Sequence, residues 1–418
     1  MGKLLVLFVT AFVDMVGLAM IVPLLPFYAT QFGSSAAVVG VLVSAFSIAQ
    51  LACAPAWGRF SDRYGRRPAI LAGLVITAAA YVIFGLAASV GALLLSRLVQ
   101  GAGGGTIGVV QAYVADASTP EERTKSLGWL SAVTSFGAVV GPAFGSALVT
   151  LGGRRAPGLA AAVLSLLVAA FAWRYLRESR VVRASGAHPA ATRTGSEAIA
   201  YVLARWHEPA PRLIWIYAVA IGAFYGTIQT VPLLLQQRFD ITERNIGYFV
   251  MYLGGMGVVV RALVLGRVVD RLGEARLSRV GILLLAAGLI ATGLAGSRLL
   301  LFVGFTLMPL GTAFLFPCVT GLLSRMISAG ERGLYMGVQH TFGGVSRVAF
   351  PIAAGIMMDR LGVGVPFWIA GVLVLGCLPL TRALETYLAP APAADRRAAL
   401  EVSELTGEFP VEQVPEKT

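Results

Sequence analysis

Two charged side chains stand inside apolar stretches of this chain. Asp14 lies within a run that covers residues 4–28, and Arg97 lies within a run that covers residues 91–115. A charged side chain in the middle of a bilayer costs at least about 2.5–3.5 kcal/mol, so it is usually paired or faces a wet cavity. A carboxylate there can take up and release a proton, and an arginine can pair alternately with it or with the substrate. We predict Asp14 and Arg97 as a proton-exchange pair; the alternative for each is a structural bond to a neighbouring helix.

A second group of charges forms a short string that occurs twice. Gly58-Arg59-Phe60-Ser61-Asp62-Arg63-Tyr64-Gly65 is matched half a chain later by Gly266-Arg267-Val268-Val269-Asp270-Arg271-Leu272-Gly273. Further landmarks keep nearly the same spacing: Val22-Pro23 returns as Val231-Pro232, Glu122-Arg123 as Glu331-Arg332, and Pro142 as Pro351. Landmarks in register indicate an internal duplication, which in a membrane protein is typical of transporters.

The runs that hold these residues are long enough to cross a membrane. Of 418 residues, 57% are hydrophobic and only 13% are charged, against about 25% charged in soluble domains. A helical span needs about 20 apolar residues, and the runs lack the alternation of β-barrel strands. We predict twelve transmembrane helices, at residues 4–28, 36–57, 69–89, 91–115, 127–150, 158–175, 213–235, 246–265, 279–296, 299–323, 334–357 and 366–387.

The duplication divides the chain into two pseudo-symmetric bundles of six helices. We expect an N-terminal bundle at 1–175 and a C-terminal bundle at 213–387, in an all-α membrane protein. The polar segment 176–212 is predicted to be a cytoplasmic linker. It is either a solvated tether or, over residues 196–206, an amphipathic helix on the membrane surface. Residues 388–418 have the composition of a disordered cytoplasmic tail.

Basic residues indicate the orientation. Most of the 33 Lys and Arg residues fall near the N-terminus, in the even-numbered loops, in the linker and in the tail. The positive-inside rule therefore places both termini in the cytoplasm of a multi-pass protein of the plasma (inner) membrane. The net charge of +12 is explained by topology, so no nucleic-acid partner is expected.

Other chemical signatures do not appear in the sequence. Cys53, Cys318 and Cys377 are far apart and lie in or beside apolar runs, so we expect neither disulfides nor a metal site. No G-x-x-x-x-G-K-[ST] phosphate loop occurs, which argues against direct use of ATP. We predict no cofactor and no enzymatic activity.

Small residues predict close helix packing in the fifth span. Gly137, Gly141 and Gly145 recur every four positions on one helix face, so another helix can approach closely. Pro142, among them, predicts a kink. In the repeated loops, Gly58 and Gly65 permit a tight turn at a helix end, and Asp62 can accept hydrogen bonds from a neighbouring arginine.

Several of these stretches resemble one family. The string from Gly58 to Arg67 resembles the loop motif between the second and third helices of the major facilitator superfamily. Asp14 to Pro26, Leu93 to Gly103 and Gly137 to Gly145 resemble the first-, fourth- and fifth-helix motifs of its twelve-helix drug:proton antiporters, such as the tetracycline exporters. Two departures stand out: Ser146 replaces the family's glycine, and Phe350-Pro351 stands opposite Gly141-Pro142.

The charged loops suggest a conformational latch. It would hold the inner sides of the two halves together and so favour the outward-facing state, with Asp116 pairing with Arg59 or Arg63. The alternative is that these charges are exposed topology signals worth about 0–1 kcal/mol per pair. The predicted latch residues are Gly58, Arg59, Asp62, Arg63, Gly65, Arg66, Asp116, Gly266, Asp270 and Arg271.

Polar and aromatic residues within other spans are candidates for a substrate cavity. Most single polar residues in such helices only bond to a neighbouring helix, which is the alternative here. Arg347 can pair with Asp359 if the helix end allows, whereas Arg261 has no evident partner. The predicted cavity residues are Gln111, Phe136, Tyr225, Gln229, Gln339 and His340.

Together these observations predict a transporter. The resemblance implies a proton-coupled antiporter that exports small apolar or amphiphilic molecules, such as drugs or natural products, by alternating access. Two alternatives stay open: a proton-coupled symporter or facilitator of a metabolite on the same fold, and a receptor-like member that does not transport. The expected partners are a small-molecule substrate, protons and membrane lipid, and the protein is expected to be a monomer.

Overall fold

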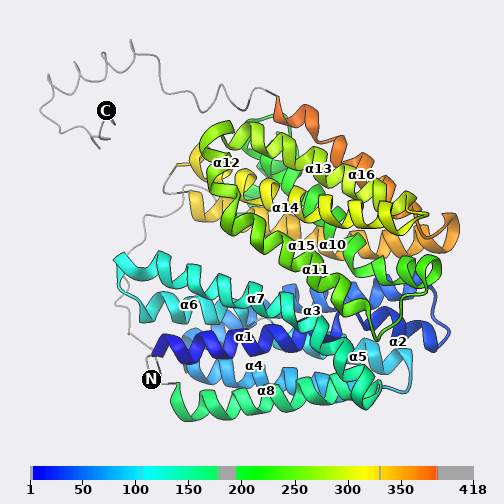
Figure 1. Cartoon of the computed structure of the whole chain (residues 1–418). Helices are drawn as coiled ribbons and strands as arrows, with labels where there is room; N and C mark the ends of the chain where they lie inside the picture. Colours follow the sequence, from blue (N-terminus) through cyan, green and yellow to red (C-terminus); the bar gives the residue numbers. More distant parts are fainter. Residues whose placement is uncertain are drawn as a thin grey trace, which may run out of the picture.

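The computed structural model describes residues 3–104, 106–176, 178, 194–328, 331–382 and 384. Over these residues it contains α-helices and one 3₁₀ turn and no strand, as the sequence predicted (Figure 1). The predicted tail at 388–418 and most of the first part of the predicted linker lie outside the described residues.

Eight helices form the N-terminal half, which lies below the C-terminal half in Figure 1. They are α1 (Lys3–Ile21), α2 (Leu25–Gln31), α3 (Ala36–Tyr64), α4 (Arg66–Gly85), α5 (Val90–Gly104), α6 (Ile107–Ala117), α7 (Pro120–Gly152) and α8 (Arg155–Tyr175). Within this half α1 packs on α7 and α8, and α4 packs on α5 and α8.

The C-terminal half repeats this arrangement. Its elements are α9 (Gly195–Ala204), α10 (Pro209–Phe239), α11 (Ile246–Leu263), α12 (Leu265–Leu272), α13 (Glu274–Leu294), α14 (Arg298–Met326), α15 (Arg332–Leu361), α16 (Val365–Leu375) and the 3₁₀ turn Leu378–Thr381. Here α13 packs on α14 and α16, and α10 packs on α15.

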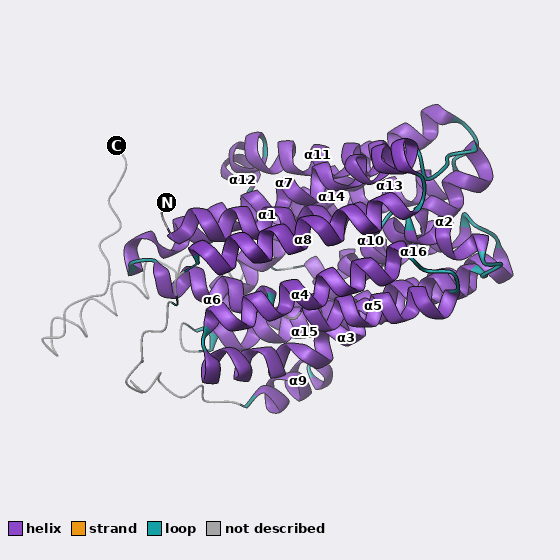
Figure 2. Ribbon diagram, turned by 90° about the horizontal axis from the view of Figure 1, so that it is seen from below, coloured by secondary structure: helices purple, strands orange, loops and turns teal. Residues whose placement is uncertain are grey.

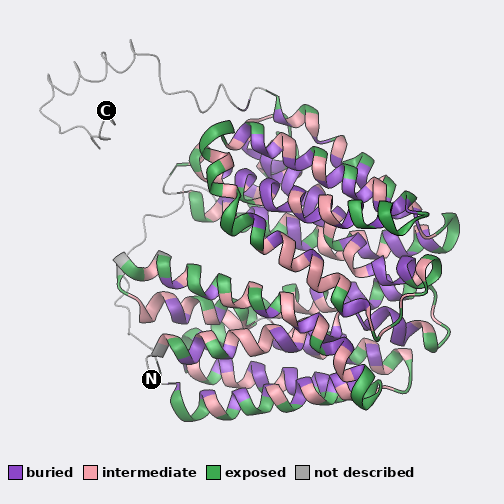
Figure 3. Ribbon diagram, in the orientation of Figure 1, coloured by how far each residue is buried: buried purple, intermediate pink, exposed green. Residues whose placement is uncertain are grey.

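The prediction of twelve spans is confirmed. Among the described residues, eleven helical stretches are long and apolar enough to cross a membrane, and the shorter apolar stretch Val365–Thr381 stands at the twelfth predicted place. Two spans are built from paired helices: α1 and α2 join across Pro23, and α5 and α6 join between Gly104 and Thr106. The chain is therefore a multi-pass membrane protein, and buried residues fill the interior of each half while exposed residues cover its outside (Figure 3).

The repeated loops are shorter than predicted. Gly65 turns the chain with φ 107°, as expected, and Gly273 does the same with φ 75°. Gly58 lies inside α3, so its predicted role as a turn at a helix end is wrong. The helix continues because the rings of Trp57, Phe60 and Tyr64 pack along it, with centroids 5.8 and 4.9 Å apart.

The later part of the predicted linker forms the helix α9. A capping box closes its N-terminus: the Thr194 side chain accepts a hydrogen bond from the Glu197 N–H, and the Glu197 carboxylate accepts one from the Thr194 N–H. Ala198 and Val202 are buried against the C-terminal half, and the rings of Tyr201 and Tyr335 lie 6.0 Å apart. This helix is attached to the C-terminal half, as Figure 2 shows by its position beside α15.

The helices run between two ends of the molecule. The "terminal end" carries Lys3 and the turns at Gly65 and Gly273, and the "far end" carries the turns at Gly33, Gly153 and Gly362. In Figure 1 the terminal end lies on the left and the far end on the right.

Candidate functional site

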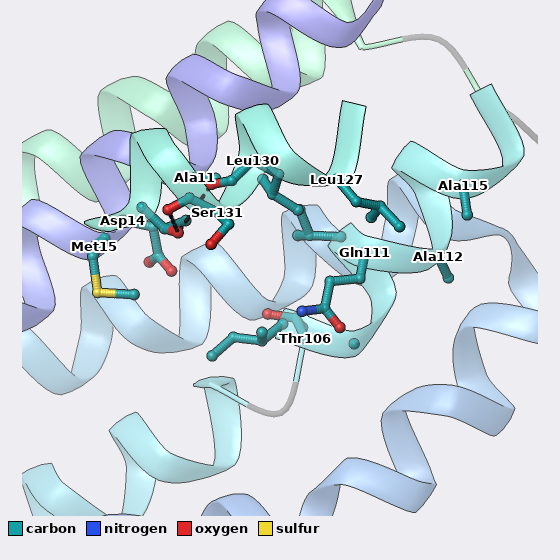
Figure 4. A pocket seen from close by; sticks show the side chains of 14 residues that line it. Ala11, Asp14, Met15, Thr106, Gln111, Ala112, Ala115, Leu127, Leu130 and Ser131 are labelled. Atoms are coloured by element: carbon teal, nitrogen blue, oxygen red, sulfur yellow. Dashed lines mark hydrogen bonds between the residues drawn. The ribbon is translucent and has the colours of Figure 1, made fainter. Parts of the chain in front are cut away.

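A cavity of about 650 Å³ lies in the N-terminal half between α1, α6 and α7. Asp14 and Met15 reach it from α1, Gln111 from α6, and Ser131 from α7 (Figure 4). Among the described residues Asp14 has no hydrogen bond or ion pair. The predicted proton carrier thus borders a space large enough for a small molecule or several waters, with Gln111 on the same wall.

A cluster of buried polar side chains lies one helical turn farther along α1. Gly17 leaves room for Tyr81 of α4, since a Cβ added at Gly17 would lie 3.3 Å from the Tyr81 hydroxyl. Tyr81 and Arg97 are 1% exposed and Gln100 is 2% exposed. The guanidinium of Arg97 donates to Gln100 Oε1, and its Cζ lies 5.0 Å from the centroid of the Phe46 ring.

This cluster contains more donors than acceptors. The Tyr81 hydroxyl, Arg97 Nε and Gln100 Nε2 are buried without a well-formed hydrogen bond, and the Tyr81 hydroxyl lies close enough to Gln100 to interact with it. A buried unsatisfied polar group costs about 1–3 kcal/mol, and a phenol hydroxyl can both donate and accept, so the cluster has capacity for a further hydrogen-bond acceptor. Asp14 is an acceptor without donors. In this conformation Arg97 bonds to Gln100, and no ion pair joins it to Asp14.

Tyr81 was missed by the sequence reasoning. A tyrosine within an apolar span looks like any other core aromatic residue, and its unsatisfied hydroxyl is visible only once helices are packed. The one usable signal was Gly17, three residues after Asp14, which indicates a close neighbour on that face of the first span.

The break between α5 and α6 positions the cavity wall. Trp57 Nε1 donates to the Ala102 carbonyl at 2.6 Å, and Gln50 Nε2 donates to the Gly104 carbonyl at 3.3 Å. These bonds from α3 satisfy carbonyl oxygens that an unbroken helix would satisfy itself. The break lets α6 set Gln111 on the wall that also carries Asp14.

The six predicted cavity residues stand in different surroundings. Gln111 alone of the six lines the 650 Å³ space. Phe136 stacks on Phe12 with ring centroids 5.9 Å apart and is 58% exposed. Gln229 is half-buried and His340 is exposed. Gln339 packs against α14, where its Oε1 lies 3.5 Å from the Thr320 hydroxyl.

Tyr225, the sixth of these residues, lies under an arginine. The Cζ of Arg347 is 5.9 Å from the centroid of the Tyr225 ring, and Tyr225 is 38% exposed. The pairing considered for Arg347 and Asp359 is not made. The Asp359 carboxylate instead accepts from the N–H groups of Ala36 and Ala37, both at 2.9 Å, at the N-terminus of α3.

Three of the predicted latch residues pair within the N-terminal half in this conformation. Arg66 bonds Asp62 at 2.8 Å and Asp116 at 3.2 Å. In this conformation Asp116 pairs with Arg66 and not with the predicted Arg59 or Arg63, because Arg66 begins α4 next to the end of α6 and reaches Asp116 from there.

The terminal end has space around its repeated glycines. Nothing lies within 4 Å of a Cβ added at Gly58, Gly266 or Gly273, and Asp270 is exposed. The turn at Gly65 is covered by Glu178, whose carboxylate accepts from the N–H groups of Arg66 at 2.9 Å and Arg67 at 3.2 Å. Glu178 thereby satisfies donors at the N-terminus of α4, where negative charge is favourable.

The glycine face of α7 packs on α1, as predicted. A Cβ added at Gly137 would lie 2.8 Å from the Phe12 carbonyl oxygen, and one at Gly141 would lie 2.8 Å from that of Val16. One at Gly145 would lie 2.4 Å from that of Met20. The backbone of α1 occupies the space that side chains would need, so α7 fixes the helix that carries Asp14.

Two seams join the halves toward the far end, and the duplication relates them. In one, α3 meets α15: a Cβ added at Gly40 would lie 2.3 Å from the Pro351 carbonyl oxygen. In the other, α11 meets α7: a Cβ added at Gly247 would lie 1.9 Å from the Pro142 carbonyl oxygen. Pro142 and Pro351 are matched landmarks of the repeat. Each seam is thus a proline-bearing helix crossing a glycine of the other half.

Polar bonds strengthen both seams. Ser44 donates to the Val348 carbonyl at 2.7 Å, in the seam that also holds the bonds of Asp359 to α3. Ser146, the departure from the family pattern, donates to the Glu243 carbonyl at 2.8 Å and accepts from the Gly247 N–H at 2.9 Å. Glu243 also pairs with Arg154 at 2.9 Å. The hydroxyl that a glycine lacks here binds the two halves together.

Comparison with known proteins agrees with this architecture. The family model of the Major Facilitator Superfamily matches residues 7–277 and 256–411. The chain is 30% identical over 379 residues to multidrug resistance protein 2 of Bacillus subtilis (strain 168), covering 88% of this chain and 92% of that protein. It is 24% identical over 371 residues to the class B tetracycline resistance protein of Escherichia coli, covering 88% and 90%.

A solved structure shows the same fold. It is that of a bacterial homolog of the human lysosomal transporter Spinster, in an inward-facing and unoccupied conformation. The two structures share a TM-score of 0.77 at 18% identity, with 94% of this chain and 98% of the other covered. Twelve apolar spans, a duplicated half, matched charged loops and a family match over most of the chain lead to one assignment: the chain belongs to the major facilitator superfamily of membrane transporters.

Proposed function

We propose that this protein is a proton-driven exporter of small apolar or amphiphilic molecules, such as drugs or natural products. One observation carries the proposal. Asp14 is an unpaired carboxylate within a membrane-spanning helix, and it borders a cavity of about 650 Å³. A buried acid without a fixed partner is suited to gain and lose a proton. The names of the multidrug and tetracycline resistance relatives favour drugs as the exported class.

The conformation fits one stage of alternating access. We place the terminal end in the cytoplasm of the inner membrane, because the basic loops lie there. The seams close the far end, and nothing lies within 4 Å of a Cβ added at Gly58 or Gly266 at the terminal end; we therefore infer that this state faces inward. In the outward-facing state the predicted latch residues of the two halves would meet at the terminal end instead.

The chain's own groups can couple the proton to this change. Protonated Asp14 is neutral and needs no partner in the cavity wall. After it loses the proton, the carboxylate attracts hydrogen-bond donors. The cluster of Tyr81, Arg97 and Gln100, which lies one turn of α1 away from Asp14, contains donors that are not satisfied. Because these donors sit on α4 and α5, their bonding to Asp14 would draw those helices toward α1. The charge state of Asp14 would thereby set the relative energies of the two conformations.

The test is a pH measurement in reconstituted vesicles. Protein is inserted into liposomes that contain pyranine, an acidic interior is imposed, and tetracycline, rhodamine 6G or taurocholate is added outside. In molecules whose cytoplasmic face is on the outside of the vesicle, antiport brings substrate in and carries protons out, so the interior becomes more alkaline. Asp14→Asn, which removes the titratable group with little change in volume, should abolish this signal.

Asp240→Asn is the matched control. Asp240 lies in the loop after α10 with φ 54°, a left-handed conformation that asparagine also adopts, and the same charge is lost there without touching the cavity. Acidification on adding substrate would instead show symport. A full antiport signal from Asp14→Asn, with Asp240→Asn also active, would remove Asp14 from the coupling mechanism.

A further inference from the structure

The C-terminal half holds two arginines in its membrane-spanning helices that have no acidic partner. Arg347 is the sixteenth of the 30 residues of α15, and Arg261 lies in the last turn of α11. Neither forms a salt bridge within the described part of the chain. The charged loops and seams described above use neither of them, so their role is open.

The sequence of the surrounding helices contains almost no negative charge. Of the spans α10, α11, α14 and α15, only α15 includes an acid, Asp359. Asp359 lies at the far end and is occupied by the N-terminus of α3. Two positive charges within membrane-spanning helices therefore stand without a counter-charge from their own half, an arrangement that is costly unless something else supplies one.

Arg347 cannot escape this cost by reaching water at a helix end. At about 1.5 Å of rise per residue, fourteen residues place its Cα roughly 20 Å from either end of α15. A snorkelling side chain can carry the charge to the interface only from near a helix end. Arg261, in the last turn of α11, is nearer the terminal end. The half-buried position of Arg347 in mid-helix therefore indicates that it faces either a polar partner or a wet cavity.

Both arginines converge on one aromatic residue. The guanidinium of Arg347 lies over the Tyr225 ring at 5.9 Å. The Arg261 side chain runs back along α11 toward the middle of the span, with Nη2 3.8 Å from a Cβ added at Gly257, and there its charge acts on the same phenol. Tyr225 belongs to α10, and 38% of its surface is not covered by other parts of the protein. The Phe224 ring lies 5.7 Å from that of Tyr225 in an edge-to-face arrangement. Two cations, a phenol and apolar surface thus lie together on three helices.

We propose that Arg261, Arg347 and Tyr225 form a subsite for the anionic group of an amphiphilic substrate, a carboxylate or a sulfonate. This proposal rests on the proposed transport function and names the class of molecule carried. An arginine fork can donate two hydrogen bonds to such a group, and the phenol hydroxyl can donate a third. The apolar body of the substrate would rest on the neighbouring aromatic rings.

The experiment compares two dyes that share a xanthene ring system and differ in charge. 5-Carboxyfluorescein is an anion and rhodamine 6G is a cation. Their binding to the purified full-length protein in dodecyl maltoside is followed by fluorescence anisotropy, with protein-free micelles as the blank. The wild type should bind carboxyfluorescein at least tenfold more tightly than rhodamine 6G, and added salt should weaken the first more than the second.

Charge-removing variants locate the subsite. Arg347→Gln and Arg261→Gln should each weaken carboxyfluorescein binding by about tenfold or more, which corresponds to about 1.4 kcal/mol, and should leave rhodamine 6G binding unchanged or tighter. Arg347→Lys should retain part of the affinity because it keeps the charge but loses the fork. Arg360→Gln is the matched control, since Arg360 is exposed on the same helix.

Several outcomes overturn the proposal. These are equal affinity of wild type and both Gln variants for carboxyfluorescein, preference for rhodamine 6G, or binding of neither dye. Displacement of the dye by micromolar phosphatidylglycerol would assign the site to lipid and would also overturn it. If Arg347→Gln does not fold, the proposal is decided by Arg261→Gln, by Arg347→Lys and by the dye preference of the wild type.

The binding assay uses no proton gradient. A wild-type protein that binds the anionic dye but gives no pyranine signal in vesicles would therefore contradict the proposed transport function and not the subsite.

Discussion

Replacing Gly247 by alanine should drive the two halves apart at the far end. The new Cβ would lie 1.9 Å from the Pro142 carbonyl oxygen, 2.5 Å from its carbon and 2.7 Å from Ser146 Oγ. Ordinary contact begins near 3.4 Å, so the helices must separate by about 1.5 Å. The obstacle is backbone, which cannot rotate aside as a flexible side chain can.

The size of the effect follows from two losses. Overpacking a close helix contact costs typically about 1–3 kcal/mol. The bond of 2.9 Å between the Gly247 N–H and Ser146 is stretched as well, which removes about 0.5–1.5 kcal/mol. At about 1.4 kcal/mol per factor of ten, the closed far end should lose at least roughly tenfold in population relative to states that are open there.

Distance measurement between spin labels tests this directly. In a background without native cysteines, labels at Leu151 and Leu299 report on the far end, because these side chains are 85% and 75% exposed in opposite halves. Gly255→Ala is the matched control on the same helix, since its Cβ would lie 3.7 Å from Val139, an ordinary contact. Gly247→Ala should lengthen the main distance and Gly255→Ala should not. Identical distance distributions for both variants would refute the interlocked seam.

Two further variants probe the other seam and the polar cluster. Asp359→Asn replaces a charged acceptor of two N–H bonds of 2.9 Å and should weaken the α3–α15 seam by about 1.5–3 kcal/mol, seen as a longer label distance at the far end; an unchanged distance would contradict this. Tyr81→Phe removes a hydroxyl without a well-formed hydrogen bond, so it should lower gradient-driven transport without lowering the melting temperature. Tyr28→Phe removes a bond of 2.6 Å to the Arg154 carbonyl, so it should lower the melting temperature and leave gradient-driven transport unchanged. A Tyr81→Phe variant with wild-type transport would exclude the Tyr81 hydroxyl from coupling.

The fold could be predicted from the sequence because its signals are long and repeated. Apolar runs of about 20 residues leave few structures open in a bilayer, and four landmarks in register reveal the duplication. The glycine face at Gly137, Gly141 and Gly145 also gave its packing correctly, since small residues at helical spacing have one main use in membranes.

Pairings between side chains could not be predicted in the same way. Asp116 has three arginines within one short motif, and only the start of α4 at Arg66 decides which of them reaches it. Gly58 seemed to end a helix, but the aromatic residues that follow it continue the helix. Tyr81 and the role of Ser146 depend on which helices meet and at what height, information that a single sequence pattern does not contain.

The two matched crossings at the far end have a mechanical meaning. Two contact points define a line. While both contacts persist, the halves can rock about that line, and the far end opens to the outward-facing state only when both contacts release. At each crossing a backbone carbonyl oxygen faces a glycine, so few side chains lie between the two helices and could let them slide past each other. An ancestral pair of helices, used once in each orientation, thus provides this protein with both pins of a hinge.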